Sequence, residues 1–512
     1  MVLVKVIIMA GGKGERFWPY SRVDRPKQFL SVVGGKSLLQ QTVARAEKLV
    51  TLEDIYIITG EEYVHIVKEQ ISQLPVQNVI VEPVGRDTAP CIGLGYTYLR
   101  DEPGSTVMLV LPADHLVINE ERFCAVMERA AEAAYRERKL VTIGLQPTRP
   151  ETGYGYIRCG APIAELDGVH EVLQFTEKPD VETAIKFLQS GEYLWNSGMF
   201  AWRLDVINEA YRRFLPEIYT GLKKIAEAIG TRKEKEVLER VFPTLPRISV
   251  DYGIMEKSED VLVVPGDFGW DDLGSWTALE RVEDPDENGN IVYGNALLVD
   301  TSHCIIRSSN KDKLLATLGL EGVVVVDTED VLLVADKSRT ADLKKLITEL
   351  KEHGLHRYLA KRQSREEAVS LESDVLDLKE SVLAQLVTKA IEENAEKIKQ
   401  LDKPWGREIW WAVTEDYVGK LIEVKAGHSL SLQYHEEKRE SMLFIKGSGV
   451  LELDGKKFAI KSGLIVDVLP GMVHRVNADT DVAFLEVSTP QTDDVVRLED
   501  HYGRAGKALP GS

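Results

Sequence analysis

The chain has 512 residues, more than one hydrophobic core accommodates, so its length predicts about two to four domains. The formal net charge of −19 excludes nucleic acid as the main partner, because nucleic-acid-binding proteins need a net basic face. The composition is that of a soluble globular protein, without a tract long enough to cross a bilayer and without a signal-peptide pattern. Four scattered cysteines without framework spacing fit the reducing cytoplasm.

Apolar strands alternate with helical stretches over residues 1–283. Strands are expected within "LVKVIIMAGG", "DIYIITG", "VIVEP", "TVMLVLPADH" and "LVTIGL", and helices within "KSLLQQTVARAEKLV" and "FCAVMERAAEAAYRER". Such alternation predicts an α/β fold, a doubly wound Rossmann-like sheet whose ligands bind at the carboxyl ends of the strands.

Three further regions follow this first domain. Short β-rich segments with turns and no helices between them, such as "CIIRSS" and "GVVVVDTEDVLLVAD", predict a small, β-helix-like domain over residues 284–345. Residues 346–400 are charged and carry apolar residues at helical spacing from Val375 to Ile391, which predicts a helical linker packed on its own chain or against a second subunit. Strand patterns throughout "KPWGREIW" and beyond predict a β-barrel domain over residues 401–512.

The stretch "MAGGKGERFWPYSRVDRPKQFL" at 9–30 concentrates glycines and cations directly after the first strand. Glycines let backbone N–H groups approach an anion closely, and the cations add full charges. The stretch is no dinucleotide fingerprint, because Phe17 replaces the last glycine, and "GGKS" at 34–37 is no Walker loop, because Leu30 replaces the first. It is therefore expected to hold phosphate in another way. The residues concerned are Gly11, Gly12, Lys13, Gly14, Arg16, Arg25 and Lys27.

The segment 11–30 resembles the signature of the sugar-1-phosphate nucleotidyltransferases, and its Trp-Pro and Pro-Lys-Gln-Phe details resemble the mannose-1-phosphate guanylyltransferases. Further segments resemble the family's motifs in the expected order, namely "EPVGRDTAP", "LPADH", "TGYGYI", "FTEKP", "WNSGMF" and "DYGIMEKSEDVLVVPGDFGWDDLGSW". The resemblance implies transfer of GMP from GTP to mannose 1-phosphate with release of pyrophosphate and with Mg²⁺ as cofactor. A transferase that uses dTTP or UTP is the alternative.

The resemblance also implies roles for residues of the first domain. Arg16 would hold the triphosphate and stabilise the leaving pyrophosphate, Lys27 would act at the α-phosphate, and Asp114 with Asp272 would hold Mg²⁺. The implied nucleotide-binding residues are Gly11, Gly12, Lys13, Gly14, Glu82, Arg86 and Thr88. The implied sugar-phosphate residues are Gly153, Glu177, Lys178 and Asn196.

Two residues depart from the family pattern in this domain. Asp87 stands where the family usually has asparagine, and a carboxylate does not donate a hydrogen bond as an amide does. Asp271 stands where serine is common, and it is expected either to add a metal contact or to face solvent.

The segments "GHSLSLQYHEEKRESMLFIKG" and "LPGMVHRVN" are similar to the two cupin motifs. Gln433 and His435 share one strand face, and with Glu440 and His474 they form a ligand set suited to Zn²⁺, Mn²⁺, Fe²⁺ or Co²⁺. Behind a guanylyltransferase, this cupin resembles a type II mannose-6-phosphate isomerase, which implies interconversion of mannose 6-phosphate and fructose 6-phosphate. The candidates for the substrate phosphate are Arg497 and Arg504.

The cupin also departs from its family. Ser441 and Met442 replace a His-Trp pair, and Glu436 with Glu437 adds a negative rim that disfavours a phosphorylated substrate. A non-catalytic, sugar-sensing cupin is therefore the alternative. The whole chain is expected in the cytoplasm as a homo-oligomer, a dimer, with nucleotides and sugar phosphates as partners and neither nucleic acid nor membrane.

Overall fold

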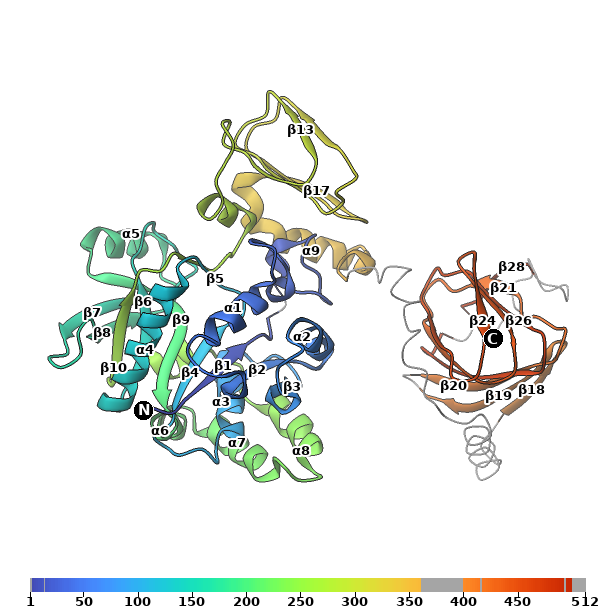
Figure 1. The fold of residues 1–512 in the computed structure, drawn as a ribbon, viewed down its shortest axis with the longest axis horizontal. Coiled ribbons are helices and arrows are strands. Elements are labelled where there is room, and N and C mark those ends of the chain that lie inside the picture. The colour runs from blue at the N-terminus through green and yellow to red at the C-terminus, as the bar shows by residue number, and fades with distance from the viewer. Residues whose placement is uncertain (1, 13, 361–398, 415–416, 492–493, 500–512) are drawn as a thin grey trace. The chain divides into compact units, whose positions relative to one another are not determined.

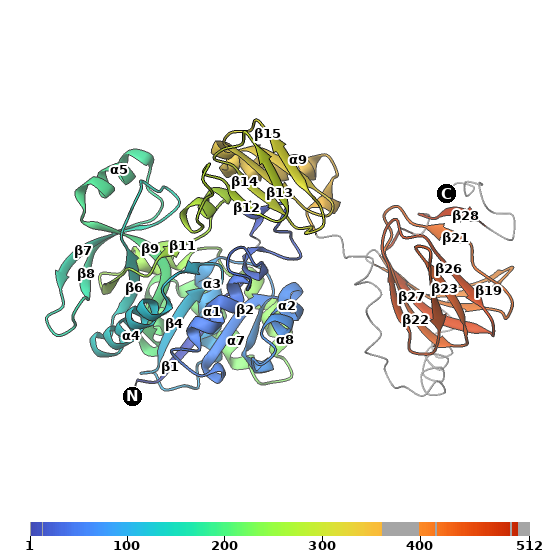
Figure 2. The same ribbon diagram turned by 45° about the horizontal axis from the view of Figure 1, so that its top comes forward.

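The computed structural model describes residues 2–12, 14–360, 399–414, 417–491 and 494–499. They belong to two compact units, residues 1–362 and 363–512, and each unit is described by itself (Figures 1 and 2). Lys13, Arg504 and the linker helix predicted around 375–391 lie outside the described residues. Within the described ranges, no helix combines the length and apolarity needed to cross a bilayer.

A nine-stranded sheet with the strand order β3-β2-β1-β4-β9-β6-β10-β8-β7 forms the centre of the first unit. β1 pairs in parallel with β2 and β4, β2 with β3, and β6 with β10, whereas β9 runs antiparallel between β4 and β6. The bounds are β1 Val4–Met9, β2 Ile55–Gly60, β3 Val79–Glu82, β4 Val107–Pro112, β6 Leu140–Leu145, β7 Tyr156–Pro162, β8 His170–Thr176, β9 Tyr193–Arg203 and β10 Val261–Gly266.

Helices cover both faces of this sheet, so the predicted doubly wound α/β architecture is confirmed (Figure 1). Successive side chains of β1 divide between two cores, with Val6 and Ile8 in one and Ile7 in the other. The first core includes residues of α1 Leu38–Ala46, α2 Val64–Gln70, α4 Glu120–Glu137 and α5 Val181–Ser190. The second includes residues of α3 Thr88–Tyr98, α6 Leu204–Phe214, α7 Pro216–Ala228 and α8 Glu234–Val241.

Two small sheets of mainly parallel strands follow, β12-β14-β16-β17 and β13-β15, as predicted for a β-helix-like domain. The bounds are β12 Ile291–Tyr293, β13 Ala296–Val299, β14 Ile305–Ser308, β15 Leu315–Leu318, β16 Val323–Asp327 and β17 Leu332–Asp336. Helix α9 (Leu343–Glu352) then packs Leu343 and Ile347 on the core of this domain. A helix thus already begins within the range predicted to lack one; the domain boundaries at 283, 345 and 400 stay predictions.

All described elements of the second unit are strands, and they form two antiparallel sheets in the orders β18-β19-β20-β27-β22-β25 and β24-β23-β26-β21-β28. Phe444 and Phe484 pack with Leu451 and Val476 in the core. The bounds are β18 Lys399–Lys403, β19 Gly406–Val413, β20 Val418–Val424, β21 Leu432–Tyr434, β22 Glu440–Lys446, β23 Gly449–Leu453, β24 Lys456–Ile460, β25 Ile465–Val468, β26 His474–Ala478, β27 Val482–Ser488 and β28 Val496–Glu499.

Candidate functional site

Several segments singled out in the sequence meet at one edge of the nine-stranded sheet. The glycine loop follows β1, Glu82 ends β3 and Asp114 follows β4, so all three lie at carboxyl ends of parallel strands. Asp272 follows β11 (Trp270–Asp271), which pairs with β5 (Leu116–Val117) in antiparallel register. This short pairing brings the chain at Asp272 next to the chain at Asp114.

Lys27 is buried between these two aspartate-bearing segments. Its Nζ lies 2.7 Å from Asp114 Oδ2 and donates to the backbone oxygens of Asp272 at 2.6 Å and Leu273 at 3.3 Å. Desolvation by itself would raise the pKa of Asp114, but the charge of Lys27, together with that of His115 and with hydrogen bonds from Lys27 and the backbone, holds that pKa below the ordinary value. Asp114 is therefore a carboxylate at neutral pH.

The side chain of Asp272 lies close to Tyr154, Gly274 and Arg16. Its Oδ1 accepts hydrogen bonds from the hydroxyl of Tyr154 at 2.6 Å and from the backbone N–H of Gly274 at 3.0 Å. A Cβ added to Gly274 would stand 2.8 Å from Asp272 Oδ2 and 3.3 Å from Nη1 of Arg16, so the guanidinium and this carboxylate flank the same glycine. Arg16 is exposed and makes no ion pair within 4 Å among the described residues. The four residues expected to perform the phosphate chemistry thus lie together.

Asp271 follows neither of the two alternatives predicted for it. The side chain is buried, and its two oxygens accept from Arg281 Nε at 2.6 Å and Nη2 at 2.8 Å. Oδ1 also accepts from the backbone N–H of Leu273. Because both oxygens are engaged by Arg281, Asp271 neither faces solvent nor presents a free oxygen to a metal ion; it braces the turn that carries Asp272.

The glycines of the opening loop have different surroundings. Gly14 has φ +55°, and a Cβ there would stand 2.4 Å from the backbone nitrogen of Lys27. A Cβ on Gly11 would stand 2.9 Å from Oε2 of Glu82. A Cβ on Gly12 would meet no atom within 4 Å. Gly14 thus permits close packing on Lys27, whereas the space beside Gly12 is open.

The segment expected to bind the nucleotide base lies beside this loop. Glu82 is buried, which raises its pKa to about 7, and its Oε1 accepts from the backbone N–H of Arg86. The buried Nε of Arg86 has no hydrogen-bond partner among the described residues. The hydroxyl of Thr88 accepts a hydrogen bond from Val250 N, which leaves its own hydrogen as a donor. Asp87 is exposed with φ +71°, and its carboxylate caps α3 by accepting from Thr88 N.

Glu177, Lys178 and Asn196 form a second cluster with a residue that the sequence analysis missed. Glu177 Oε1 lies 2.6 Å from Lys178 Nζ, while the buried Oε2 lacks a hydrogen-bond partner among the described residues and faces Gly155. Asn196 Nδ2 donates to Asp251 Oδ1 at 2.7 Å. Burial, followed by the charge of Glu177, raises the pKa of Asp251 to about 7. This cluster provides an unused buried acceptor beside a partly exposed cation.

Gly153 stands apart from this cluster in its hydrogen bonding. It is exposed, and its N–H donates to Oε1 of Glu151 at 3.1 Å. Arg149 lies over the rings of Tyr154 and Trp195, with its guanidinium carbon 5.7 and 4.9 Å from their centroids. The backbone contact to sugar expected at Gly153 stays a prediction.

Four contacts at this site were not found from the sequence. Tyr154, Asp251 and Trp270 stood within the quoted motifs, which was the available signal, but their partners are distant in the chain: Tyr154 binds Asp272, and Trp270 Nε1 donates to His115 Nδ1 at 3.1 Å. Arg281, which binds Asp271, lay beyond the last motif and gave no signal.

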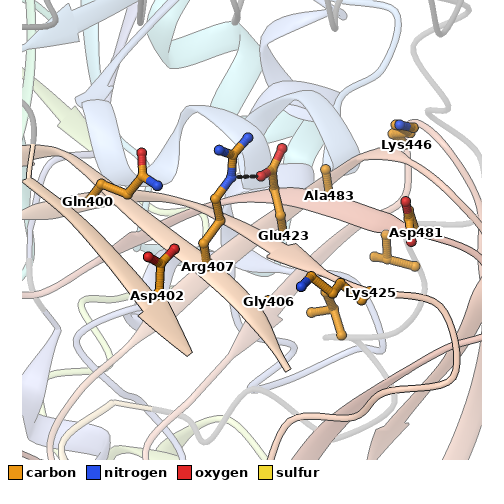
Figure 3. A pocket seen from close by; sticks show the side chains of 11 residues that line it. Gln400, Asp402, Gly406, Arg407, Glu423, Lys425, Lys446, Asp481 and Ala483 are labelled. Carbon is orange, nitrogen blue, oxygen red and sulfur yellow. Dashed lines mark hydrogen bonds and ion pairs between the residues drawn. The ribbon is translucent and has the colours of Figure 1, made fainter. Parts of the chain in front are cut away.

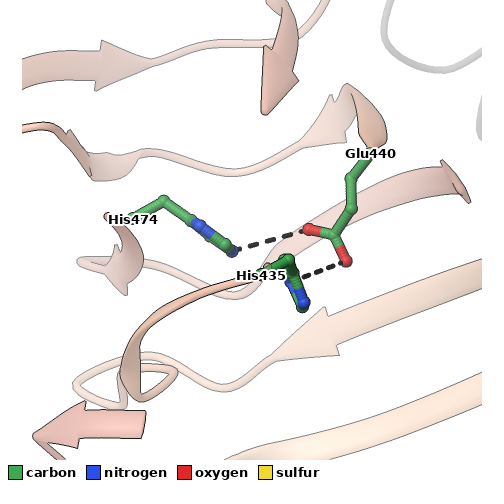
Figure 4. A group of neighbouring side chains, drawn as sticks. All are labelled: His435, Glu440 and His474. Carbon is green, nitrogen blue, oxygen red and sulfur yellow. Dashed lines mark ion pairs between the residues drawn. The ribbon is translucent and has the colours of Figure 1, made fainter. Parts of the chain in front are cut away.

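The cupin unit contains a compact group of potential metal ligands (Figure 4). His435, Glu440 and His474 are buried, and one ligand atom from each lies within 4.8 Å of the others. The Nε2 atoms of His435 and His474 lie 3.2 and 3.5 Å from Glu440 oxygens. Gln433 Nε2 lies 3.4 Å from His474 Nε2, and Arg497 is the register partner of Gln433 across β21 and β28. The four predicted ligands are thus neighbours.

Both imidazole rings are oriented through their other nitrogen. His474 Nδ1 lies 3.1 Å from the carbonyl oxygen of Met472, and His435 Nδ1 contacts that of Asp494. A carbonyl only accepts, so each Nδ1 carries a proton, and each Nε2 is turned toward Glu440. The buried His435 Nε2 and Glu440 Oε2 lack a hydrogen-bond partner among the described residues, which fits a cation bound between them.

A buried lysine already neutralises part of this charge. Lys438 Nζ contacts Glu440 Oε1 and lies 3.2 Å from Glu486, which in turn pairs with Lys420 at 2.8 Å. Burial would raise the pKa of Glu440, but His435 and Lys438 outweigh it and hold the pKa below its ordinary range. Glu440 is therefore ionised and available as a ligand.

Only one of the residues that depart from the cupin family lies on the face of a ligand. Strand alternation in β22 places Met442 on the same buried face as Glu440, in the core, and directs Ser441 to Asp467, whose Oδ1 accepts from the Ser441 hydroxyl at 2.5 Å. Glu436 and Glu437 are exposed, and their backbone N–H groups donate to the carboxylate of Asp494. The acidic rim exists, but it lies outside the buried ligands.

A groove of about 450 Å³ lies elsewhere on the cupin unit (Figure 3). Arg407 and Glu423 pair across it, and Asp481 accepts from Ala426 N. The charged side chains that line it are three cations and three carboxylates, namely Asp402, Arg407, Glu423, Lys425, Lys446 and Asp481. Because their formal charges sum to zero, the groove selects no class of charged ligand.

A cationic and carboxylate cluster at the carboxyl edge of a doubly wound sheet, joined to a cupin that groups His and Glu as potential metal ligands, defines a two-domain phosphate-handling enzyme. Comparison with known families gives the same division. The nucleotidyl transferase profile matches residues 5–289, the mannose-phosphate isomerase/GMP-like β-helix profile matches 294–350, and the mannose-6-phosphate isomerase C-terminal profile matches 391–500.

The chain belongs to the mannose-1-phosphate guanylyltransferase family of nucleotidyl transferases, with a C-terminal mannose-6-phosphate isomerase domain. A mannose-1-phosphate guanylyltransferase of Klebsiella pneumoniae is 35% identical over 97% of this chain and 99% of its own length. The xanthan biosynthesis protein XanB of Xanthomonas campestris pv. campestris is also 35% identical, over 97% and 98%. A solved structure described as mannose-1-phosphate geranyltransferase from Thermus thermophilus is 38% identical, covers 68% of this chain and 99% of that one, and has a TM-score of 0.62.

Proposed function

We propose that the chain transfers GMP from GTP to mannose 1-phosphate, which yields GDP-mannose and pyrophosphate, and that its cupin interconverts mannose 6-phosphate and fructose 6-phosphate. The observation that carries the transfer is the convergence of Arg16, Lys27, Asp114 and Asp272 at one edge of the sheet. Membership of the guanylyltransferase family supports the choice of substrates.

The reaction joins two polyanions, so charge neutralisation and positioning supply the catalysis. A phosphate oxygen of mannose 1-phosphate attacks the α-phosphorus of GTP, and the bond from that phosphorus to the bridging oxygen breaks to release pyrophosphate. Lys27 is buried and fixed by three oxygens, which suits a point charge held at the α-phosphate. Arg16 is exposed and free of ion pairs among the described residues, which suits a cation that receives the triphosphate and the leaving pyrophosphate.

The residues at this edge fit Mg²⁺. Asp114 and Asp272 present carboxylate oxygens, the ligands that this hard cation prefers, and Asp272 Oδ1 is oriented by Tyr154 and Gly274. When bound, Mg²⁺ supplies neutralising charge to phosphate oxygens. Asp271 is excluded from the ligand set because Arg281 binds both of its oxygens.

Glu82 suits recognition of guanine. A carboxylate accepts two hydrogen bonds side by side, and guanine presents two adjacent donors, whereas thymine and uracil present one. Glu82 lies against Gly11 of the phosphate loop, and the buried Nε of Arg86 lies in the same segment. Asp87 is an exposed helix cap here, so its replacement of asparagine bears on α3 rather than on the base.

Glu177 and Asn196 suit the sugar hydroxyls. The buried Oε2 of Glu177 is an unused acceptor, and Asn196 has one amide hydrogen left after donating to Asp251. Lys178 is half-exposed beside them and suits the sugar phosphate.

The cupin ligands suit a divalent transition metal such as Zn²⁺, Mn²⁺ or Co²⁺. His435, Glu440 and His474 supply two imidazoles and one carboxylate, and Gln433 adds an amide. When bound, such an ion polarises the sugar carbonyl while a proton moves between neighbouring carbons. Arg497, next to Gln433 in the sheet register, suits the substrate phosphate.

Pyrophosphate release measured with four nucleoside triphosphates and several sugar 1-phosphates tests the transfer. We expect turnover with GTP and mannose 1-phosphate only, and a loss of about 10²–10³ in kcat for Lys27→Ala. Lys36→Ala, an exposed lysine of the same region, is the matched control and should retain wild-type turnover. Preference for dTTP or UTP would replace this proposal with the alternative transferase.

A coupled assay of fructose 6-phosphate conversion, with and without chelator, tests the isomerase. Conversion that needs metal and disappears in the doubly substituted His435→Ala, His474→Ala protein supports it; metal binding without conversion identifies a sugar-sensing cupin instead. The cytoplasmic location and the dimer stay predictions, which fractionation and light scattering test.

A further inference from the structure

The loop that carries Arg16 and Lys27 is held by hydrogen bonds and an ion pair to the β-helix domain and to the chain that follows this domain. Arg22 lies between those two cations in the sequence and is only 5% exposed. Its Nη2 pairs with Asp330 Oδ1 at 2.6 Å and donates to Thr328 Oγ1 at 3.2 Å, both beyond β16. The guanidinium of Arg22 is thus anchored in the other domain.

Two side chains and one backbone N–H of the same loop contact the backbone of residues 358 and 359. Trp18 Nε1 donates to the carbonyl of Tyr358 at 2.8 Å, and Arg22 Nη1 contacts that same carbonyl. The backbone N–H of Val23 donates to the carbonyl of Leu359 at 2.8 Å. Two consecutive carbonyls therefore hold the middle of the loop.

Arg307 of β14 holds the end of the loop. Its Nη1 donates to the carbonyl of Val32 at 3.0 Å, and its Nη2 donates to the carbonyl of Ser31 at 2.9 Å and to the hydroxyl of Tyr20 at 3.1 Å. Its guanidinium carbon lies 4.2 Å from the ring centroid of Tyr20 and 4.4 Å from that of Tyr293. A planar donor between two aromatic rings fixes direction as well as distance.

One apolar core continues across this contact. Phe17, Trp18 and Leu30 of the loop pack in the same cluster as Ile305 of β14 and Val324 of β16. Apolar packing of this kind holds the loop and the domain together but does not fix their relative orientation. The buried guanidinium groups fix that orientation, because each of their N–H donors must reach its own acceptor.

We propose that Arg22 and Arg307 are positioning residues for nucleotidyl transfer: the β-helix domain sets the orientation of the loop and thereby of Arg16 and Lys27. The proposal rests on the proposed transfer reaction. Gln28 holds the loop from the sheet side, by donating to the carbonyls of Ala10 and Gly12. The two arginines are the counterpart on the opposite side, so that the loop is held between two domains.

The kinetics of full-length variants test whether Arg22 and Arg307 position the loop for catalysis. Arg307→Met removes the donors and keeps an apolar stem, and Asp330→Asn weakens the anchor of Arg22 at little steric cost. We expect kcat for pyrophosphate release to fall about 10- to 100-fold, as for misplacement of a catalytic group by about 1 Å, with the KM for mannose 1-phosphate within twofold of wild type. Arg307→Lys should recover part of the loss. Arg339→Met, an exposed arginine of the same region, is the matched control and should keep wild-type kcat.

A second measurement separates positioning from general destabilisation. In a Lys27→Ala background, Arg307→Met should cost less than it does in the wild-type background, because the part of its effect that acts through Lys27 is already lost. Amide exchange of residues 16–30 should accelerate in Arg307→Met while that of β1 and β4 does not. Folded variants with wild-type kcat would overturn the proposal, and if Arg307→Met fails to fold, Asp330→Asn decides. A wild-type protein without pyrophosphate release would instead overturn the proposed function, so the two failures are distinct.

Discussion

Gly14→Ala tests whether the glycine loop acts by seating Lys27. Gly14 has φ +55°, and an ideal Cβ would stand 2.4 Å from Lys27 N and 2.8 Å from Lys27 Cβ. Non-bonded heavy atoms prefer separations of about 3.5 Å, so the Lys27 backbone must retreat by about 1 Å. Because Lys27 Nζ contacts oxygens at 2.6 and 2.7 Å, such a shift breaks its contacts with Asp114 and Asp272.

Two separate costs follow from this substitution. The left-handed backbone of an alanine costs about 1–2 kcal/mol of folding free energy. The displacement of Lys27 is expected to cost about 10²-fold in kcat, or about 2.7 kcal/mol of barrier. The matched control is Gly35→Ala: Gly35 has φ +78° but a Cβ there meets no atom within 4 Å, so that variant shares the strain and not the collision.

The assay is steady-state pyrophosphate release with GTP and mannose 1-phosphate, next to thermal unfolding of the same preparations. Gly14→Ala should lose kcat and unfold at a lower temperature, whereas Gly35→Ala should lose only stability. Equal kcat in the two variants, with both folded, would refute the reasoning that Gly14 exists to admit Lys27.

Three further predictions concern separate parts of the molecule. Glu82 has a pKa of about 7, so its ionised fraction falls below that pH, and the KM for GTP should rise about tenfold from pH 8 to pH 6 beyond the change seen in Glu82→Gln; parallel profiles would contradict the proposed base contact. Asp271→Asn loses charge-assisted bonds to Arg281, so chemical unfolding should show a loss of about 1.5–3 kcal/mol, while the Mg²⁺ concentration for half-maximal activity stays unchanged; a shift in that concentration would make Asp271 a ligand. Replacing His435 and His474 together should remove bound transition metal, measured by elemental analysis, and leave GDP-mannose formation intact; retained metal would reject the cupin site.

The sequence predicted the strands that carry mainly apolar runs and missed strands that lay inside motifs interpreted as binding segments. β1, β4 and β6 read as nearly continuous apolar runs, which is the pattern of a central strand. The hairpin of β7 and β8 is largely exposed, so its pattern carries little periodicity. β9 was interpreted only as a binding motif, because Asn196 and its neighbours resemble one, although the same residues form the antiparallel strand between β4 and β6.

At the candidate site, the resemblance to the family proposed residues by motif and missed partners that are set by folding. It implied Asp114 and Asp272 as Mg²⁺ ligands, and carboxylates that end separate segments suit such a cation. Arg281 gives no such signal, because it matters only through the fold, which brings it to Asp271. Whether Asp271 is a metal ligand or a solvated carboxylate therefore depended on its pairing with Arg281, which no local sequence pattern indicates.

The same reasoning sorts the cations of the opening loop, which composition alone treats as equal. A buried guanidinium needs acceptors for its donors, and Arg22 has them in Asp330, Thr328 and a backbone carbonyl. Its charge is therefore paired within the protein and is not presented to a ligand. Lys27 is equally buried, but its partners are the carboxylate of Asp114 and carbonyls at the candidate metal site, so its charge stays at the reacting edge. Only Arg16 combines exposure with the absence of an ion-pair partner among the described residues. In a chain of net charge −19, Arg16 is therefore the described cation of this loop best suited to receive the proposed triphosphate, whereas Arg22 would act only through the geometry of the loop.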